Sequence, residues 1–475
     1  MAQKTIQIAD KPTLDRVAGW TSATISVTTS ENTKLVFTDG VTTKEVTTDA
    51  NGKCIFPVPN RGTWTVSKGD NSDSSVVKVE YNQNYPVRLR GGKVCFGFRK
   101  AKNDSNPASR IEYLEDAVGL TPAKMDFTTG AFNYGDWSDV WFVKDNYPCM
   151  LKLDGTEAYR LNPNDYSKKA DGTNSDVANT AFSGNAMSAM PLVWLYQYED
   201  SSYEYTYVAN YQVNSSFQAY AHTDEDGKIH DYIYMSIYKG YLNGSRLSSF
   251  SGVQPMYSKT AQQEIDAAEL NGKQWYVKTW AQRNLLQCLM TLMFKTTDMQ
   301  TALGKGNLNY DTSKSPTNGV LKTGTLDKAG QFWGANDNIH QVKAFHQEAV
   351  WADQWDRIAG IINNKGSVQV KMIPPYNLNA TGYTAAGVTP GGTSRGYINK
   401  TKNSMLGCIP TTASGSETTY EADGMWYNNS QVDIALVGGH CYVDSLCGLF
   451  ALYLSDGASA TGWHVGASLS AYPAS

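Results

Sequence analysis

Two histidines and two cysteines stand close together near the C-terminal end, and such side chains can bind metals or undergo redox chemistry. His440 directly precedes Cys441, Cys447 follows shortly after, and His464 lies further along. The chain contains no CxxC pair and no HExxH motif, so the spacing does not match a known metal-ligand pattern. Cys441 and Cys447 can form a disulfide, or they can be chance members of a run of unselected side chains. We predict no metal site and no cofactor.

Carboxylates are the other residues that could do chemistry, because a pair of them can hydrolyse a glycan. Asp224, Asp226 and Glu348 are the candidates, but nothing in the sequence pairs them. The acidic run at 224–227 lacks the spacing of a calcium-binding loop, so we interpret it as a solvated turn. No GxSxG motif, phosphate loop or dinucleotide fingerprint is found. We therefore predict no catalytic residue and no enzyme.

Charge and composition exclude several classes of partner. The 475 residues carry a net charge of −4, and only 18% are charged, so there is no basic patch for nucleic acid or anionic membrane. No apolar run is long enough to span a bilayer. The first residues, MAQKTIQIAD, lack a secretory signal, and we expect synthesis in a bacterial cytoplasm. The 29 tyrosines are typical of recognition surfaces and of β-rich extracellular proteins alike.

The most informative stretch is LVGGHCYVDSLCGLFALYLSDGASATGWHVGASL, residues 436–469. Glycines and apolar residues recur through it as a frame, whereas 440–447 follows neither a helical nor a strand period. A glycine-bracketed run of arbitrary side chains on an apolar frame suits a binding surface. The alternative is a glycine-rich pair of core strands.

This frame resembles the variable region that ends the variable proteins of diversity-generating retroelements. The matching residues are Gly438, Gly439, Gly448, Leu449, Phe450, Ala451, Leu452, Leu454, Ser459, Trp463, Gly466, Ala467 and Leu469. Cys441 stands where Trp is usual in the family, and Ser468 where Arg is usual. The resemblance implies a C-type-lectin-like fold related to formylglycine-generating enzymes, in which adenine-directed mutagenesis exchanges the side chains between frame positions.

The resemblance also assigns roles to residues in a variable region of about 438–469. The ligand-binding, exposed set is His440, Cys441, Tyr442, Val443, Asp444, Leu446, Tyr453, Ser455, Asp456, Ala460, Gly462 and His464. The scaffold set is Gly438, Gly439, Gly448, Phe450, Trp463 and Gly466. Enzymes of the related fold use a copper-binding cysteine pair, but Cys441 and Cys447 lie within the run expected to vary.

The remaining elements divide the chain into three parts. Residues 1–90 show short Val-, Thr- and aromatic-rich runs between turn signals, which predict seven strands in a small immunoglobulin-like β-sandwich. We expect strands over 23–28, 34–38, 43–47, 53–57, 63–68, 75–81 and 86–89. Residues 91–110 are polar and glycine-rich and are expected to form a linker. Residues 111–475 are expected to form one large, elaborated C-type-lectin-like domain, so the predicted fold class is α+β.

Helices are predicted at two places in this larger part. Residues 260–270 and 279–294 have helical patterns, and the second carries a broad apolar face that indicates burial. A shorter helix is predicted over 113–119. Residues 375–424 are rich in Gly, Thr, Asn and Ser and predict long surface loops.

Together these features predict a phage or prophage tail receptor-binding protein, made without a signal peptide and located in the virion. Its diversified surface is expected to bind a host-cell-surface protein or glycan, with contact area from Tyr442, Tyr453 and Trp463. The N-terminal part is expected to dock to tail proteins, with residues 1–20 as the candidate attachment segment, and we expect a homo-oligomer, a trimer. The alternatives are a tail-associated glycan-degrading enzyme and a bacterial surface adhesin of the same fold.

Overall fold

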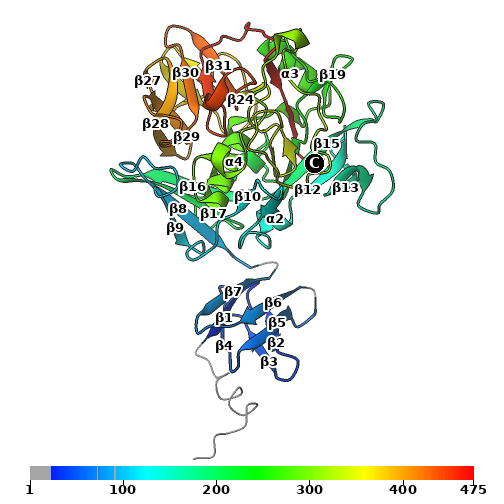
Figure 1. The fold of residues 1–475 in the computed structure, drawn as a ribbon, viewed down its shortest axis with the longest axis vertical. Helices are drawn as coiled ribbons and strands as arrows, with labels where there is room; N and C mark the ends of the chain where they lie inside the picture. The colour runs from blue at the N-terminus through cyan, green and yellow to red at the C-terminus, as the bar shows by residue number, and fades with distance from the viewer. Residues whose placement is uncertain (1–22, 72, 90–91, 475) are drawn as a thin grey trace, which may run out of the picture. The chain divides into compact units, whose positions relative to one another are not determined.

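The computed structural model describes residues 23–71, 73–89 and 92–474 (Figure 1). The chain forms two compact units, Met1–Val94 and Cys95–Ser475. Residues 1–20, for which we predicted a docking role, lie outside the described residues.

The first unit is built from seven strands in two sheets around one core. The strands are β1 (Thr24–Thr28), β2 (Lys34–Thr38), β3 (Thr43–Thr47), β4 (Lys53–Pro57), β5 (Gly62–Lys68), β6 (Ser74–Val79) and β7 (Asn84–Arg88). One sheet has the order β4-β1-β7 and the other β3-β2-β5-β6. Alternate residues point into the core, where Phe37 stacks on Phe56 at 4.3 Å beside the fully buried Trp64. The seven predicted strands are confirmed to within two residues at nearly every end.

Three larger sheets make up most of the second unit. The seven-stranded sheet has the order β14 (Asp165–Lys169), β13 (Glu157–Asn162), β12 (Tyr147–Lys152), β15 (Gly184–Pro191), β18 (Tyr232–Ser236), β34 (Leu469–Ala471), β21 (Trp275–Val277). The four-stranded sheet has the order β16 (Trp194–Glu199), β17 (Tyr203–Ala209), β8 (Cys95–Ala101), β9 (Ile111–Glu115).

The ten-stranded sheet contains the strands on either side of the C-terminal loops. Its order is β26 (Thr384–Ala385), β25 (Ser367–Val370), β24 (Trp355–Asn364), β31 (Val432–Val437), β32 (Leu452–Leu454), β30 (Gly424–Tyr427), β28 (Arg395–Ser404), β29 (Gly407–Ala413), β27 (Gly391–Gly392), with β33 (Val465–Ala467) paired to β24. Small hairpins pair β10 (Lys124–Asp126) with β11 (Ala131–Asn133), β19 (Tyr241–Asn243) with β20 (Arg246–Ser248), and β22 (Lys343–Ala344) with β23 (Gln347–Glu348).

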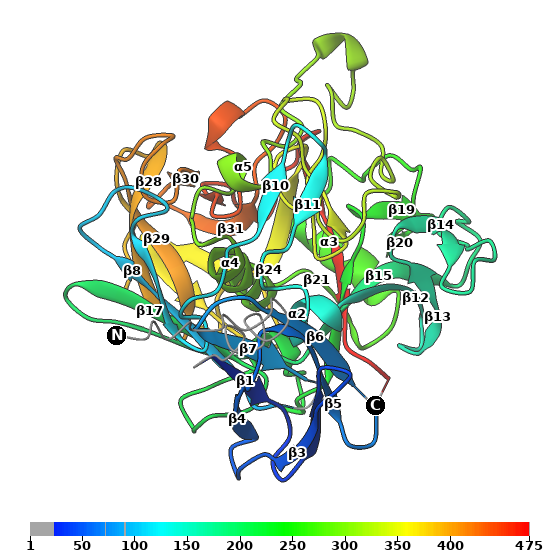
Figure 2. The ribbon, with the colours of Figure 1, turned by 60° about the horizontal axis from the view of Figure 1, so that its bottom comes forward.

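The helices of the described chain are α2 (Trp141–Lys144), α3 (Ala261–Glu269), α4 (Trp280–Phe294) and α5 (Met299–Ala302). The two helices predicted over 260–270 and 279–294 are confirmed as α3 and α4. Each begins with a capping box, made by Thr260 with Gln263 and by Thr279 with Gln282. Every residue of α4 is buried. In both views α4 lies near the middle of the unit, with β28 and β29 to one side and β12 and β15 to the other (Figures 1 and 2).

The predicted α+β class, an immunoglobulin-like sandwich followed by a C-type-lectin-like domain, is wrong. The described chain is mostly β, with 38% strand, 9% helix and four helices. Only α3 and α4 combine a capped start with more than two turns of helical pattern. The helix predicted over 113–119 is instead the end of strand β9 and a turn, because Tyr113 alternates with exposed neighbours on the strand. Among the described residues no helix is long and apolar enough to cross a membrane.

The segment 91–110, predicted as a linker, contains strand β8. Its polar letters include Lys100, which is buried and forms ion pairs with Glu204 at 2.7 Å and Glu421 at 2.9 Å. Arg110 is also buried and contacts the carboxylate of Glu421 at 3.3 Å. Residue type alone does not distinguish a buried, ion-paired lysine or arginine from an exposed one. The linker prediction was wrong because it took these charged residues to be exposed.

The C-terminal stretch joins two of the sheets. Strands β31, β32 and β33 belong to the ten-stranded sheet, and β34, two residues after β33, lies in the seven-stranded sheet between β18 and β21. Two loops leave this framework, one between β31 and β32 and one between β32 and β33. We call residues 438–448 the first loop and residues 455–464 the second loop.

Candidate ligand-binding surface

The first loop is irregular and is closed at its base by its own backbone. The amide of Gly448 donates to the carbonyl oxygen of Gly438 at 3.0 Å. Between them the chain forms a short 3₁₀ turn, η3 (Asp444–Leu446), and no strand. The missing period of residues 440–447 therefore reflects a loop, and the interpretation of this run as a core strand is wrong.

Two glycines of the scaffold set are required by the backbone of the first loop. Gly439 has φ +93°, and a Cβ there would lie 2.3 Å from the Sγ of Cys447. Gly448 has φ +148°, and a Cβ there would lie 1.9 Å from the carboxylate of Asp423. That carboxylate accepts the amide of Phe450 at 2.7 Å, so the close approach fixes the exit of the loop.

Side chains from outside the first loop bind its backbone carbonyls. Arg283 on α4 donates to Gly448 O at 3.0 Å, and Gln287, one turn later, donates to Leu449 O at 3.2 Å. Gln300 on α5 donates to the carbonyl oxygens of Ser445 at 2.8 Å and Cys447 at 2.6 Å. Because every residue type carries these carbonyls, these bonds do not depend on the side chains of the loop. Two further contacts do use loop side chains: the Ser445 hydroxyl bonds to Tyr397 at 2.6 Å, and the Cys441 thiol donates to Asn318 O at 3.6 Å.

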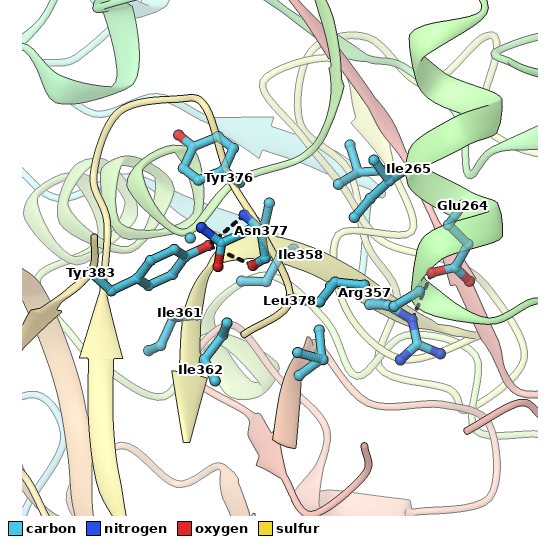
Figure 3. Close-up of a pocket in the computed structure, with 15 residues that line it drawn as sticks. Glu264, Ile265, Arg357, Ile358, Ile361, Ile362, Tyr376, Asn377, Leu378 and Tyr383 are labelled. Atoms are coloured by element: carbon cyan, nitrogen blue, oxygen red, sulfur yellow. Dashed lines mark hydrogen bonds and ion pairs between the residues drawn. The ribbon is translucent and has the colours of Figure 1, made fainter. Parts of the chain in front are cut away.

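The second loop is held in the same way. The amides of Ser258 and Ala261 donate to the carbonyl oxygens of Gly462 and Ala458, both at 3.0 Å. Arg357 on β24 donates through Nη2 to Ala460 O at 2.9 Å. Its Nε binds the buried carboxylate of Glu264 at 2.6 Å, which orients the guanidinium (Figure 3). The second loop is therefore also held through its backbone atoms.

The two loops bring aromatic and histidine side chains together in one cluster. We call it the aromatic cluster, and its members are Tyr310, Trp355, Trp426, His440, Tyr442, Tyr453, Trp463 and His464. Ring centroids lie 4.4 Å apart for Tyr310 and Tyr442, 5.6 Å for Tyr310 and Trp463, and 5.4 Å for Trp463 and His440. They continue at 4.6 Å for His440 and His464, 6.1 Å for His440 and Trp355, and 5.6 Å for Trp355 and Tyr453. Trp426 ends the series, 5.9 Å from Tyr453.

The cluster has an open edge and a buried base. Tyr442 is 64% exposed and Tyr310 is 37% exposed, whereas Trp463, His464 and Tyr453 are half-buried. His440, Trp355 and Trp426 are buried beneath them. An aromatic surface with a rigid base offers contact area at small entropy cost.

The two histidines of the cluster are uncharged at neutral pH. Burial lowers the pKa of His440 to about 3, helped by the neighbouring His464 and Arg395. Burial also lowers the pKa of His464, against the attraction of Asp456. The Nδ1 atoms of both rings are buried and have no hydrogen-bond partner among the described residues. The cluster is therefore neutral at its base. Arg395, which lies over Trp426, and Asp444 of the first loop are exposed charges.

The predicted exposed set is partly wrong. Tyr442 and Asp444 are exposed, and Leu446, Tyr453, Ser455, Asp456, Ala460, Gly462 and His464 are half-buried. His440, Cys441 and Val443 are instead buried, at 6%, 1% and 8% exposure. The Gly438-Gly439 turn directs this part of the loop inward, where the Cys441 amide binds Asp353 O at 3.1 Å. Asp456 joins the cluster through Tyr453, whose hydroxyl donates to it at 3.2 Å.

The scaffold set is buried except for one member. Phe450 and Gly466 lie in the core with the glycines, but Trp463 is half-buried and contacts Tyr310, His440 and His464. Sequence reasoning did not assign Tyr310, Trp355, Trp426 or Arg395 to the surface. The Arg395 guanidinium lies 5.8 Å above the ring of Trp426. Nothing in the spacing of these residues signals the contact, because they come from four separate segments.

The side chains considered for chemistry are engaged elsewhere. Cys441 and Cys447 are buried and form no disulfide. Glu348 is buried, and its carboxylate accepts the amides of Gly324 at 2.8 Å and Leu326 at 3.0 Å. Asp224 contacts the ring of His230 at 2.7 Å. Among the described residues, no group of three His, Cys, Asp or Glu side chains could hold a metal ion.

A separate apolar pocket lies between α3 and β24, lined among others by Ile265, Ile361, Leu378 and Tyr383 (Figure 3). None of its lining residues belongs to the aromatic cluster.

No protein-family model matches the chain, and no curated protein matches it. The function proposed for the protein therefore depends on the geometry of the two loops and of the aromatic cluster.

Proposed function

We propose that the chain is a receptor-binding protein whose two C-terminal loops present exchangeable side chains to a ligand. One observation carries this proposal: the loops are anchored through their backbone carbonyls, by Arg283, Gln287, Gln300 and Arg357, while their outward side chains meet in one aromatic cluster. Anchoring of this kind is compatible with new side chains in the loops. The variable proteins that the chain resembles would need this property, because their side chains are exchanged.

In this proposal the ligand is a protein or glycan of a host-cell surface. The open edge made by Tyr310, Tyr442 and Trp463 supplies contact area, and Asp444 and Arg395 supply charged contacts beside it. The protein acts on a phage tail, its N-terminal unit attaches it to other tail proteins, and several copies, as in a trimer, raise the effective concentration of weak sites.

A binding comparison of three proteins on arrays of bacterial cell-surface glycans and proteins tests the proposal. The unmodified chain is expected to bind a subset of the array, and Tyr442→Ala is expected to lose at least about tenfold in affinity, as for an interface anchor. Tyr81→Ala is the matched control, because Tyr81 is 65% exposed, as Tyr442 is 64% exposed, and lies in the N-terminal unit. Equal binding by Tyr442→Ala and the unmodified chain would refute the proposal.

A further inference from the structure

A small chamber lies at the N-terminal end of α4, and none of its lining residues belongs to the aromatic cluster. It is lined by Lys278 and Thr279, just before the helix, by Arg283 in its first turns, and by Gln347 and Asp356 from neighbouring strands. Its volume is about 20 Å³, enough for one water molecule or one small ion.

Positive charge is in excess around this chamber. Lys278 and Arg283 line it, and Lys239, which is buried, lies 3.4 Å from Asp356. Burial lowers the pKa of Lys278 to about 8, so its ammonium is still mostly charged at pH 7. Burial raises the pKa of Asp423, the other carboxyl that acts on Arg283, well above its usual range, so Asp423 opposes the positive charge less than an ordinary carboxylate does. Two cations, Lys278 and Arg283, thus line the chamber with one carboxylate, Asp356, which already pairs with Lys239. The positive end of the α4 dipole adds to these two cations.

Several polar groups that line the chamber have no partner. Gln347 is fully buried, and neither its amide nitrogen nor its amide oxygen finds a hydrogen-bond partner in the described chain. The Nε of buried Arg283 and the Oδ1 of Asp356 are also without one there. Because unpaired buried donors and charges are costly, a guest must satisfy them.

We propose that this chamber binds one monovalent inorganic anion of the size of chloride. A water molecule could bond to Gln347 but would leave the charges of Lys278 and Arg283 uncompensated. Sulfate and phosphate exceed the volume of the chamber. A single small anion accepts from the unpaired donors, Arg283 Nε and Gln347 Nε2, and offsets this charge.

The bound anion stabilises the position of the first loop, because the guanidinium of Arg283 lines the chamber and also binds the backbone of that loop. Its Nη1 donates to Val350 O at 2.8 Å and its Nη2 to Gly448 O at 3.0 Å. An anion at Nε completes the set of partners of the guanidinium and holds it in this orientation.

Crystals of the full chain grown or soaked in sodium bromide provide the direct test. An anomalous bromide peak is expected inside the chamber, within hydrogen-bond distance of the Lys278 ammonium and the Gln347 amide. An empty or water-filled chamber in those crystals would overturn the proposal, and this measurement requires no variant.

Thermal unfolding in sodium chloride and in sodium gluconate at equal ionic strength is the second test. The Tm is expected to be higher in chloride, with a rise that saturates as the anion concentration increases. Lys278→Met should lose this rise, whereas Lys328→Met, which removes an exposed lysine, should keep it. Gln347→Leu is the second variant in case Lys278→Met does not fold. The proposal is overturned if chloride does not raise the Tm of the unmodified chain. It is also overturned if chloride raises the Tm of both chamber variants as much.

Discussion

The guanidinium of Arg283 donates to the carbonyl oxygen of Gly448 at 3.0 Å, so the central helix α4 holds the end of the first loop directly. The same guanidinium donates to Val350 O at 2.8 Å, next to the residues that lead into β24. One buried side chain thus connects the core helix, the approach to a central strand and a loop that is expected to vary.

The two bonds of Arg283 predict that Arg283→Lys destabilises the larger unit. A lysine keeps the charge but has no planar fork to hold both carbonyls, so a charge-assisted bond worth about 2 kcal/mol is lost. Urea unfolding measures the change, and Arg99→Lys, whose partner Glu112 is exposed, should cost clearly less. Equal costs for the two variants would contradict the anchoring role.

The close contact of Gly439 with Cys447 predicts that Gly439→Ala is more harmful than a comparable glycine substitution. Gly172 has φ +86°, close to the φ +93° of Gly439, but a Cβ there meets nothing within 4 Å. Gly172→Ala should cost about 1 kcal/mol from backbone strain alone, and Gly439→Ala roughly 2 kcal/mol more because Cys447 must move. The difference between their free energies of unfolding checks the prediction.

The low pKa of His440 predicts a specific dependence of stability on pH. Its folded pKa is about 3, below an unfolded value of about 6.5, so the unfolded chain binds the proton first. The stability from neutral His440 is complete above about pH 6.5 and falls by up to about 1.4 kcal/mol per pH unit below it. His440→Phe should flatten the loss between pH 6 and pH 4, and parallel curves for the two proteins would show that His440 titrates normally.

Adjacent residues of the first loop should respond differently to substitution. Tyr442→Ser changes a side chain that is 64% exposed and should alter the free energy of unfolding by under about 1 kcal/mol. Val443→Ser places a hydroxyl at a position that is 8% exposed and should cost about 2 kcal/mol. Denaturant unfolding of both variants compares the two positions, and similar costs would mean that the loop does not separate variable from supporting residues.

Local patterns in the sequence determined a large part of the secondary structure. The seven strands of the first unit and helices α3 and α4 were predictable because alternation, capping boxes and turn residues act within a few positions. The glycines at 438, 439 and 448 were recognisable for the same reason, since a positive φ restricts the residue type at its own position.

Only the tertiary structure decided which residues share the aromatic cluster. Tyr310 and Trp355 contact side chains of the two loops, and Trp426 contacts Tyr453 on the strand between them, all from segments far apart in the chain. No local period of the sequence indicates such contacts. The tertiary structure also decided that Cys441 and Val443 are buried while Tyr442 between them is exposed. In a loop without a regular period, the backbone hydrogen bonds that hold the loop set the orientation of each side chain. The mostly β class was also decided at this level, because a strand is stable only when it pairs with neighbouring strands, many of them distant in sequence.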